Sequence, residues 1–329
     1  MKRFRMLGIL AVLMLTAAPG TNGTAASSPV EANITLCMPA DTTGAVADVA
    51  VTRNNFRPYN LNVSLQLFAS GGDALNAVAA GQCDMANTSE LPGLTLAARG
   101  AKVYLVADGL TTRKNIGIVG KTSIRSPQDF IGKAVAYQPA SVGQVFFVSY
   151  VNYHKLDASR IKQINITAPD TLTVLLRGDA DAVFIWNPWL TRGSKEVPGM
   201  HIIAYSGDND IWVVTSSYYV GQRLQSDPAL AARVFKGLID AETWFNAHKA
   251  EGYKIVATWL KTTVPIVAEQ ASLFTYEIKC SATTRERVGK VNDMLAQIRP
   301  EAAGKVDLDT FLQPQGLRLA APLRARGCR

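Results

Sequence analysis

The sequence predicts an α/β protein of two lobes, each a mostly parallel sheet flanked by helices, joined by two crossover strands and completed by a helical C-terminal region. Two observations favour this fold class. Short apolar strands alternate with helical patterns as far as residue 205, which is typical of sheets covered by helices. In addition, one strand–helix–strand unit occurs twice. The predicted lobes are residues 27–112 together with 217–329, and residues 113–216.

The repeated unit has the form Asp-x-Leu-x5-Gly-x2-Asp and occupies residues 73–84 and 170–181, without a gap in either copy. Gly81 and Gly178 stand where each helical pattern ends, a position at which a positive φ costs glycine nothing. The aspartate that closes each copy precedes an apolar strand. We interpret these two aspartates as structural residues that tie down the preceding turn, not as a catalytic pair.

The remaining elements follow from periodicity and from helix caps. Predicted strands lie at 33–38, 62–68, 84–87, 102–108, 115–120, 134–137, 162–166, 182–186 and 201–205. Predicted helices lie at 45–54, 73–80, 91–98, 142–154, 170–177, 188–194, 228–248, 253–260, 264–274 and 284–298. The chain passes between the lobes near residues 112–117 and 212–217, and a pair of extended crossings predicts a hinge beside a cleft.

The N-terminal segment predicts export. Three basic residues, an apolar run over residues 6–18 and a stretch of small residues predict a signal peptide over residues 1–26. An uncleaved anchor is the alternative, and the first cysteine, Cys37, lies too far along to carry a lipid. Cleavage removes three basic side chains and lowers the formal charge from +8 to +5. The other basic residues are scattered, so nucleic-acid binding is not predicted.

Four cysteines in an exported protein allow two disulfides with three pairings. We favour Cys280 with Cys328, because closing a C-terminal loop of this size removes unfolded-state entropy worth about 3–4 kcal/mol. Cys37 and Cys83 lie in strand-like runs and are interpreted as small buried apolar residues. No zinc spacing occurs and the three histidines are widely separated, so neither a metal nor a cofactor is predicted.

Two helix starts are candidate ligand contacts. Ser70 and Gly71 open one helix in the first lobe, and Ser141 with Val142 opens another in the second. A hydroxyl beside free backbone N–H groups and the positive end of a helix dipole suits a carboxylate or another oxyanion. Ordinary helix capping is the alternative interpretation.

Other candidate contacts follow strand ends. Ser89 lies at the carboxyl edge of the first sheet, where ligands bind in open α/β folds. Trp186 and Asn187 follow a strand of the second lobe, and an indole there could stack on a ligand or pack between helix and sheet. Asp41, with Thr42 beside it, lies on a loop facing the cleft, where a carboxylate could hold an amine or remain solvated.

Two catalytic patterns are incomplete. Residues 117–122 end like a phosphate-binding loop, but the first glycine is replaced by Asn115. Residues 139–143 resemble the nucleophile elbow of serine hydrolases, with Pro139 where the tight turn requires glycine. A hydrolase using Ser141 is therefore kept only as a less favoured alternative, and no catalytic residue is predicted.

The chain resembles the extracytoplasmic substrate-binding proteins of nitrate, sulfonate and taurine type ABC importers. The matching segments agree in order and spacing over nearly the whole exported chain: residues 55–63, 68–72, 80–84, 126–133, 178–183 and 186–188. The resemblance implies a type II periplasmic-binding fold, a ligand held between the lobes, and delivery to a membrane permease with its ATPase. It also implies a set of ligand-binding residues: Asp41, Thr42, Ser70, Gly71, Ser89, Ser141, Val142, Trp186 and Asn187.

The sequence departs from that family at two places. Asn187 replaces an acidic residue that the family often carries, and the loop at residues 39–44 is short and lacks the usual aromatic side chain. A specific ligand such as taurine is therefore not predicted from the resemblance.

The predicted function is non-catalytic. We expect a monomeric periplasmic protein that captures a small polar solute, anionic or zwitterionic, by hinge closure and delivers it to an ABC importer. The alternatives are a binder of an aromatic or amine-containing solute similar to a thiamine precursor, an enzyme on the same fold, and a sensor subunit that partners with a receptor.

Overall fold

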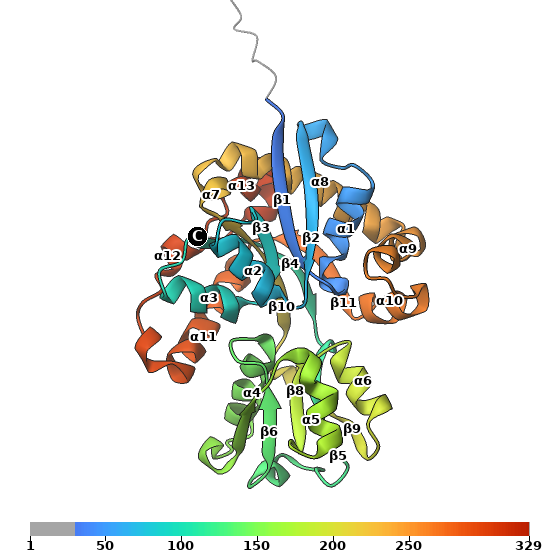
Figure 1. The fold of residues 1–329 in the computed structure, drawn as a ribbon. Helices are drawn as coiled ribbons and strands as arrows, with labels where there is room; N and C mark the ends of the chain where they lie inside the picture. The colour runs from blue at the N-terminus through green and yellow to red at the C-terminus, as the bar shows by residue number, and fades with distance from the viewer. Residues whose placement is uncertain (1–29, 329) are drawn as a thin grey trace, which may run out of the picture. The chain divides into compact units, whose positions relative to one another are not determined.

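Two β-sheets flanked by helices organise the chain in the computed structural model, which describes residues 30–328. Figure 1 shows the two sheets in separate halves of this part of the chain. The predicted signal peptide lies outside the described residues. No helix between residues 30 and 328 is long and apolar enough to cross a membrane. The predicted α/β architecture with two sheets, flanking helices and a helical C-terminal region is confirmed.

The first sheet has six strands in the order β11-β4-β10-β3-β1-β2. Their bounds are β1 Ala32–Pro39, β2 Leu61–Phe68, β3 Met85–Thr88, β4 Val103–Thr112, β10 Val214–Gly221 and β11 Phe274–Lys279. β1 pairs in parallel with β2 and β3, whereas β10 and β11 pair antiparallel with their neighbours. The expectation of a mostly parallel sheet is therefore wrong, because the chain returns from the second lobe through the centre of the first sheet as β10.

The second sheet has five strands in the order β7-β6-β8-β5-β9. Their bounds are β5 Ile116–Lys121, β6 Ala134–Tyr137, β7 Lys162–Asn165, β8 Ala182–Trp186 and β9 Met200–Tyr205. β6 is parallel to β7 and β8, and β5 is antiparallel to β8 and β9. This sheet is mixed as well, because β5 enters it in the opposite direction to its parallel core.

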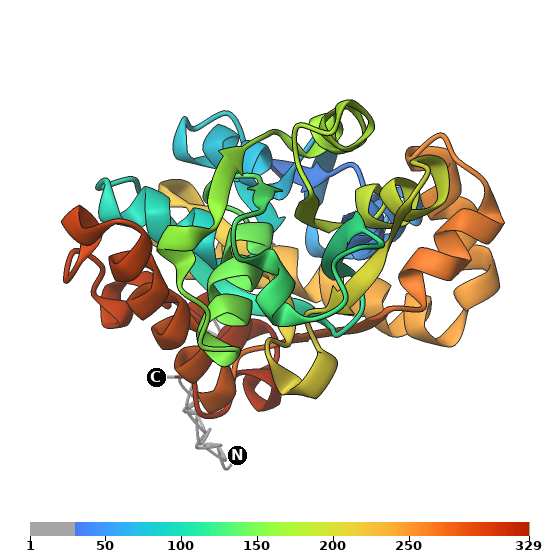
Figure 2. The same cartoon turned by 90° about the horizontal axis from the view of Figure 1, so that it is seen from below.

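The helices fall into three groups along the chain. The first-sheet helices are α1 Ala45–Thr52, α2 Gly71–Ala79 and α3 Glu90–Ala98, and the second-sheet helices are α4 Val142–Tyr153, α5 Thr171–Arg177 and α6 Trp189–Glu196. The C-terminal helices are α7 Gln222–Ser226, α8 Pro228–Ala247, α9 Lys249–Trp259, α10 Val264–Ala271, α11 Ala282–Ile298, α12 Leu308–Phe311 and α13 Gln315–Ala320. Figure 2 shows the last helices (red) and α9 with α10 (orange) at opposite sides of the view.

One predicted helix is too long. The pattern at 264–274 predicted a helix to its end, but α10 stops at Ala271 and β11 begins at Phe274. Along β11 the side chains of Phe274, Tyr276 and Ile278 are buried while those between them are not. This period of two is the alternation of a strand that faces a core on one side.

The two closing aspartates of the repeated unit have the same role in both sheets. The Asp84 carboxylate accepts a hydrogen bond from the Thr35 N–H at 2.9 Å, and the Asp181 carboxylate accepts one from the Ala134 N–H, also at 2.9 Å. Each aspartate thus joins the start of its strand to the adjacent parallel strand. Both residues are structural, but each ties down a neighbouring strand and not the preceding turn. Gly81 and Gly178 end α2 and α5 with φ of 74° and 72°, as predicted.

Two linkers, residues 113–115 and 206–213, connect the sheets and are hydrogen bonded to each other. The Gly207 N–H donates to the Arg113 carbonyl at 2.9 Å, and the Arg113 guanidinium forms an ion pair with Asp210. A Cβ atom at position 207 would collide with the Arg113 side chain, so this close approach requires glycine.

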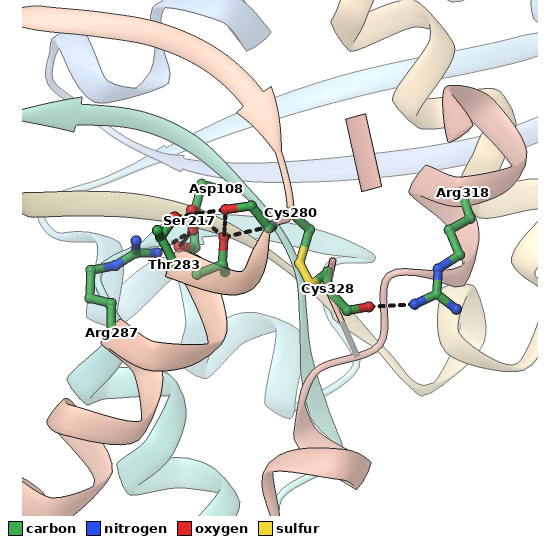
Figure 3. The surroundings of a disulfide bond; sticks show 9 residues. Asp108, Ser217, Cys280, Thr283, Arg287, Arg318 and Cys328 are labelled. Carbon is green, nitrogen blue, oxygen red and sulfur yellow. Dashed lines mark hydrogen bonds and ion pairs between the residues drawn. A yellow bond between two sulfur atoms is a disulfide. The ribbon is translucent and has the colours of Figure 1, made fainter. Parts of the chain in front are cut away.

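Both disulfides lie in the first-sheet half of the chain. Cys280 is bonded to Cys328, the pair favoured from the sequence, with Cα atoms 5.3 Å apart. Figure 3 shows this bond just before α11, where Arg318 donates to the Cys328 carbonyl. Cys37 is bonded to Cys83 across a Cα distance of 6.0 Å, so the interpretation of these two residues as simple apolar side chains is wrong. The parallel pairing of β1 with β3 brings them together.

Candidate ligand-binding site

A cleft is lined by residues from the carboxyl ends of strands in both sheets. It contains about 600 Å³ of unfilled space, part of it open to solvent. Residues that follow β1, β2 and β3 form one wall, and residues that follow β6 and β8 form the other. The carboxyl ends of parallel strands are where open α/β sheets bind ligands, because helix N-termini gather there.

The first-sheet wall is built on the N-terminus of α2. Ser70 caps this helix: its Oγ accepts from the Asp73 N–H at 3.2 Å and donates to the Asp73 carboxylate at 2.7 Å. A Cβ atom on Gly71 would lie 2.6 Å from Thr88 Oγ1, so α2 starts directly against the end of β3. The N–H groups of the first helical turn have no acceptor within the helix, so this wall presents donors.

The second-sheet wall repeats the construction on α4. Ser141 Oγ accepts from the Gly143 N–H at 3.1 Å and donates to the Gln138 carbonyl at 2.7 Å. A Cβ atom on Gly143 would lie 2.5 Å from the Phe184 carbonyl oxygen, so α4 also starts against the next strand. Val142 and Trp186 add apolar surface beside this helix start. Two helix N-termini therefore face one cleft from different sheets.

Asp41 is the one ionisable side chain among the cleft-lining residues of the described chain. Its carboxylate accepts from the Thr43 N–H at 2.8 Å and from the Thr43 hydroxyl at 2.5 Å. Burial raises the pKa of Asp41, and the two hydrogen bonds from Thr43 oppose that rise. Since neither wall of the cleft holds a basic side chain, an anion bound there would be stabilised by hydrogen bonds from N–H and O–H donors.

Seven of the nine ligand contacts expected from the sequence line the cleft: Asp41, Ser70, Gly71, Ser89, Ser141, Val142 and Trp186. Thr42 and Asn187 do not. Thr42 is buried behind the wall, where its carbonyl accepts from the Tyr276 hydroxyl at 2.7 Å, and Thr43 lines the cleft in its place. The Asn187 amide oxygen accepts from the N–H and the hydroxyl of Thr191, so this side chain holds the start of α6.

Sequence reasoning missed the part of the wall that comes from β10 and β11. Thr215, Ser216 and Phe274 line the cleft, although the sequence predicts only a crossing near residues 212–217 and a helix at 264–274. The hydroxyl-rich run at 215–217 was the available signal, because polar side chains in a buried strand need a partner. Asn87, which is not among the predicted contacts, also lines the cleft.

The cleft offers Ser141 no histidine base within the described residues. His154 packs against Tyr150, His201 Nδ1 contacts the Gly120 carbonyl at 3.2 Å, and His248 stacks on Trp244. No group of three potential metal ligands occurs between residues 30 and 328. The geometry of this part of the chain therefore gives the hydrolase alternative no support.

Comparisons with known proteins agree with this architecture. A family model described as NMT1/THI5 like matches residues 44–205. A taurine-binding periplasmic protein of Escherichia coli is 24% identical over 224 residues, which cover 66% of this chain and 67% of the relative. The matched region includes both helix starts that face the cleft.

Two solved structures share the fold. The alkanesulfonate-binding protein from Xanthomonas axonopodis pv. citri, bound to MOPS, superposes with a TM-score of 0.74 at 16% identity and covers 86% of this chain and 99% of its own. The periplasmic nitrate-binding protein from Synechocystis superposes with a TM-score of 0.72 at 13% identity, over 90% of each chain. The chain is therefore similar to the NMT1/THI5-like family over residues 44–205, and it shares its fold with these two structures.

Proposed function

We propose that this protein is a periplasmic solute-binding protein that captures a small anionic or zwitterionic solute of the sulfonate class and delivers it to an ABC importer, without catalysing a reaction. One observation carries the proposal: the N-termini of α2 and α4 face a single cleft from two sheets. The similar proteins are named for binding taurine, alkanesulfonates and nitrate, which supports an anionic or zwitterionic solute here as well.

Helix N-termini are suited to an oxyanion that lacks a basic counterion. First-turn N–H groups donate hydrogen bonds, and the helix dipole places partial positive charge at the same point. Ser70 and Ser141 hold the two helix starts in place, and a sulfonate or carboxylate between them would accept from both walls. Its carbon chain would lie against Val142 and Trp186.

Asp41 adds a reason to favour a zwitterion. A buried carboxylate that lacks a cation has a raised pKa, and an ammonium group placed beside it would favour the ionised form again. Taurine carries a sulfonate and an ammonium separated by two carbons, so it matches one acidic and several donor positions in the same cleft. We use taurine as the first probe for this reason.

The linkers suggest how the cleft opens. We propose lobes comprising residues 27–112 with 217–329, and residues 113–216, which move about the two hydrogen-bonded linkers as a monomer. A permease with its ATPase would then receive the solute from the closed form. Export through removal of residues 1–26 belongs to the same proposal.

Removing both cap hydroxyls should weaken taurine binding. In Ser70→Ala with Ser141→Ala we expect at least a tenfold rise in Kd, because each helix start loses the hydrogen bond that fixes its donors, worth about 1 kcal/mol per cap. Isothermal titration calorimetry measures the change. Ser126→Ala is the matched control, since Ser126 caps a short helix outside the cleft. An unchanged affinity in the double variant would contradict a site built on the two helix starts.

The role of Asp41 can be separated from that of the helix starts. In Asp41→Asn we expect a tenfold or larger loss of taurine affinity, about 1.4 kcal/mol, and little change for ethanesulfonate, which lacks the amine. Competition titrations with the two sulfonates measure the difference. An equal loss for both ligands would show that Asp41 supports the wall through Thr43 and does not bind an ammonium.

A further inference from the structure

Of the seven described residues that carry a buried, unpaired side-chain atom, three lie in one segment, residues 206–215, which runs from the end of β9 into β10. Within the described residues, Ser206 Oγ, Trp212 Nε1 and Thr215 Oγ1 are buried atoms without a hydrogen-bond partner. These three side chains are 0%, 8% and 0% exposed. A buried polar group that has lost its bonds to water and gained none raises the free energy of the conformation that buries it.

The backbone of the same segment is well paired. The Ser206 N–H donates to the Ile116 carbonyl at 2.9 Å, and the Trp212 N–H donates to the Ser206 carbonyl at 2.7 Å. In this segment the main chain is therefore hydrogen bonded to its surroundings, whereas three of the side chains are not. A mismatch that affects the side chains of this segment and not its main chain points to a second arrangement in which the side chains are paired.

A second cavity borders the same segment. Residues of α4, of α11 and of the linker at 210–213 line it, and it contains about 1220 Å³ of unfilled space, part of it open to solvent. Thr215 lines both this second cavity and the ligand cleft, so the segment separates the two hollows. A rotation about the segment that widens the cleft would narrow the second cavity.

The same rotation would move α4, which borders both the ligand cleft and the second cavity. Its first turn lines the ligand cleft at Ser141, and its later turns line the second cavity at Ser149 and Asn152. Across that cavity α11 presents polar side chains, among them Glu286 and Thr283. These groups could receive or supply hydrogen bonds for the segment once the second cavity narrows.

We infer that the described conformation is the more closed of two, and that the unpaired side chains of residues 206–215 favour the more open one. This inference rests on the proposed solute-binding function. The segment then sets the fraction of unliganded protein that is ready to bind, and the apparent Kd equals the intrinsic Kd divided by that fraction. Ser206 and Trp212, which do not line the cleft, would thereby tune the affinity for the solute.

Ser206→Ala tests the inference, because it removes one unpaired hydroxyl and Ser206 does not line the cleft. We expect the unliganded protein to become more compact in small-angle X-ray scattering and the Kd for taurine to fall about fivefold or more. Thr215→Val, which keeps the side-chain shape, should shift the scattering in the same direction. Thr95→Val is the matched control: Thr95 Oγ1 is likewise buried and unpaired, but it lies in α3 outside the segment.

The results for these variants either support the role of residues 206–215 or overturn it. If Ser206→Ala and Thr95→Val both raise the melting temperature and neither changes the scattering, the unpaired groups are only a cost in stability and the inference is wrong. Weaker taurine binding by Ser206→Ala would also overturn it. If the unaltered protein does not bind taurine, the proposed solute class fails, while the scattering of the unliganded variants still confirms or overturns the role of the segment.

Discussion

Replacing Arg287 with methionine is expected to destabilise the fold by about 3–5 kcal/mol, the largest loss anticipated for a single side chain. The Arg287 guanidinium contacts the Glu90 carboxylate at 2.6 Å and the Asp108 carboxylate at 2.5 Å. These two acidic side chains are only 2% and 4% exposed. Without Arg287 both would be buried charges that lack a cation. Urea unfolding at neutral pH, followed by circular dichroism, measures the loss.

The effect is large because the network joins distant parts of the chain. Asp108 also accepts from the Thr284 hydroxyl at 2.8 Å and from the Ser217 hydroxyl at 3.0 Å, so α11 is fixed to β4 and β10. Figure 3 shows Asp108 beside Ser217 and Arg287. Burial raises the pKa of Glu90 even though Arg287 opposes the rise. Burial alone would lower the pKa of Arg287, but the charges of Glu90 and Asp108 outweigh it and raise the value.

Two further variants show whether unpaired charge is the cause. Glu90→Gln and Asp108→Asn added to Arg287→Met should restore part of the stability, because no buried charge is then left alone. Lys290→Met removes an exposed partner of Glu286 on the same helix and should change the stability by less than about 1 kcal/mol. An effect of Arg287→Met as small as that of Lys290→Met would contradict the buried network.

The repeated unit was the part of the fold that the sequence predicted best. A helix end with positive φ at Gly81 and Gly178 depends on local sterics, and local sterics are readable in the chain. The partners of Asp84 and Asp181 were not predictable in the same way. They lie on strands 49 and 47 residues away, and only the strand order brings them together.

Mixed sheets and the second disulfide escaped prediction for a related reason. β10 is buried along its whole length between two neighbours, so it shows no alternation of apolar and polar residues. The bond between Cys37 and Cys83 depends on the register of β1 with β3, which is a long-range property. Strand order and register come from packing of the whole sheet and not from any one segment.

At the candidate site, the sequence identified the helix starts and was less accurate on their neighbours. Ser70 and Ser141 were found because a serine before a helical pattern is a local signature of an N-cap. Thr42 and Thr43 differ only by one step around a short 3-10 helix, and that step decides which of them faces the cleft. A pattern of residue types does not specify such a rotation.

Replacing Asp48 with asparagine is expected to stabilise the protein more and more as the pH rises. Asp48 lies in the first turn of α1 and is 1% exposed, and within the described residues neither of its carboxylate oxygens has a hydrogen-bond partner. Burial, and then the nearby charge of Asp41, raise the pKa of Asp48 well above its usual value. The folded protein therefore binds this proton more tightly than the unfolded chain does.

The direction in which stability changes with pH follows from that difference in proton binding. Below the unfolded pKa of about 4 the carboxyl is protonated in both states, and the stabilisation from the tighter proton is fully present. As the pH rises towards the folded pKa, the stabilisation is lost at about 1.4 kcal/mol per pH unit. Asp48→Asn should thus be close to the unaltered protein in stability at about pH 4 and more stable at about pH 8. Urea unfolding across this range measures the difference, with the exposed Asp293→Asn as control. A difference that does not change with pH would mean that Asp48 finds a partner in the folded protein and is ionised there.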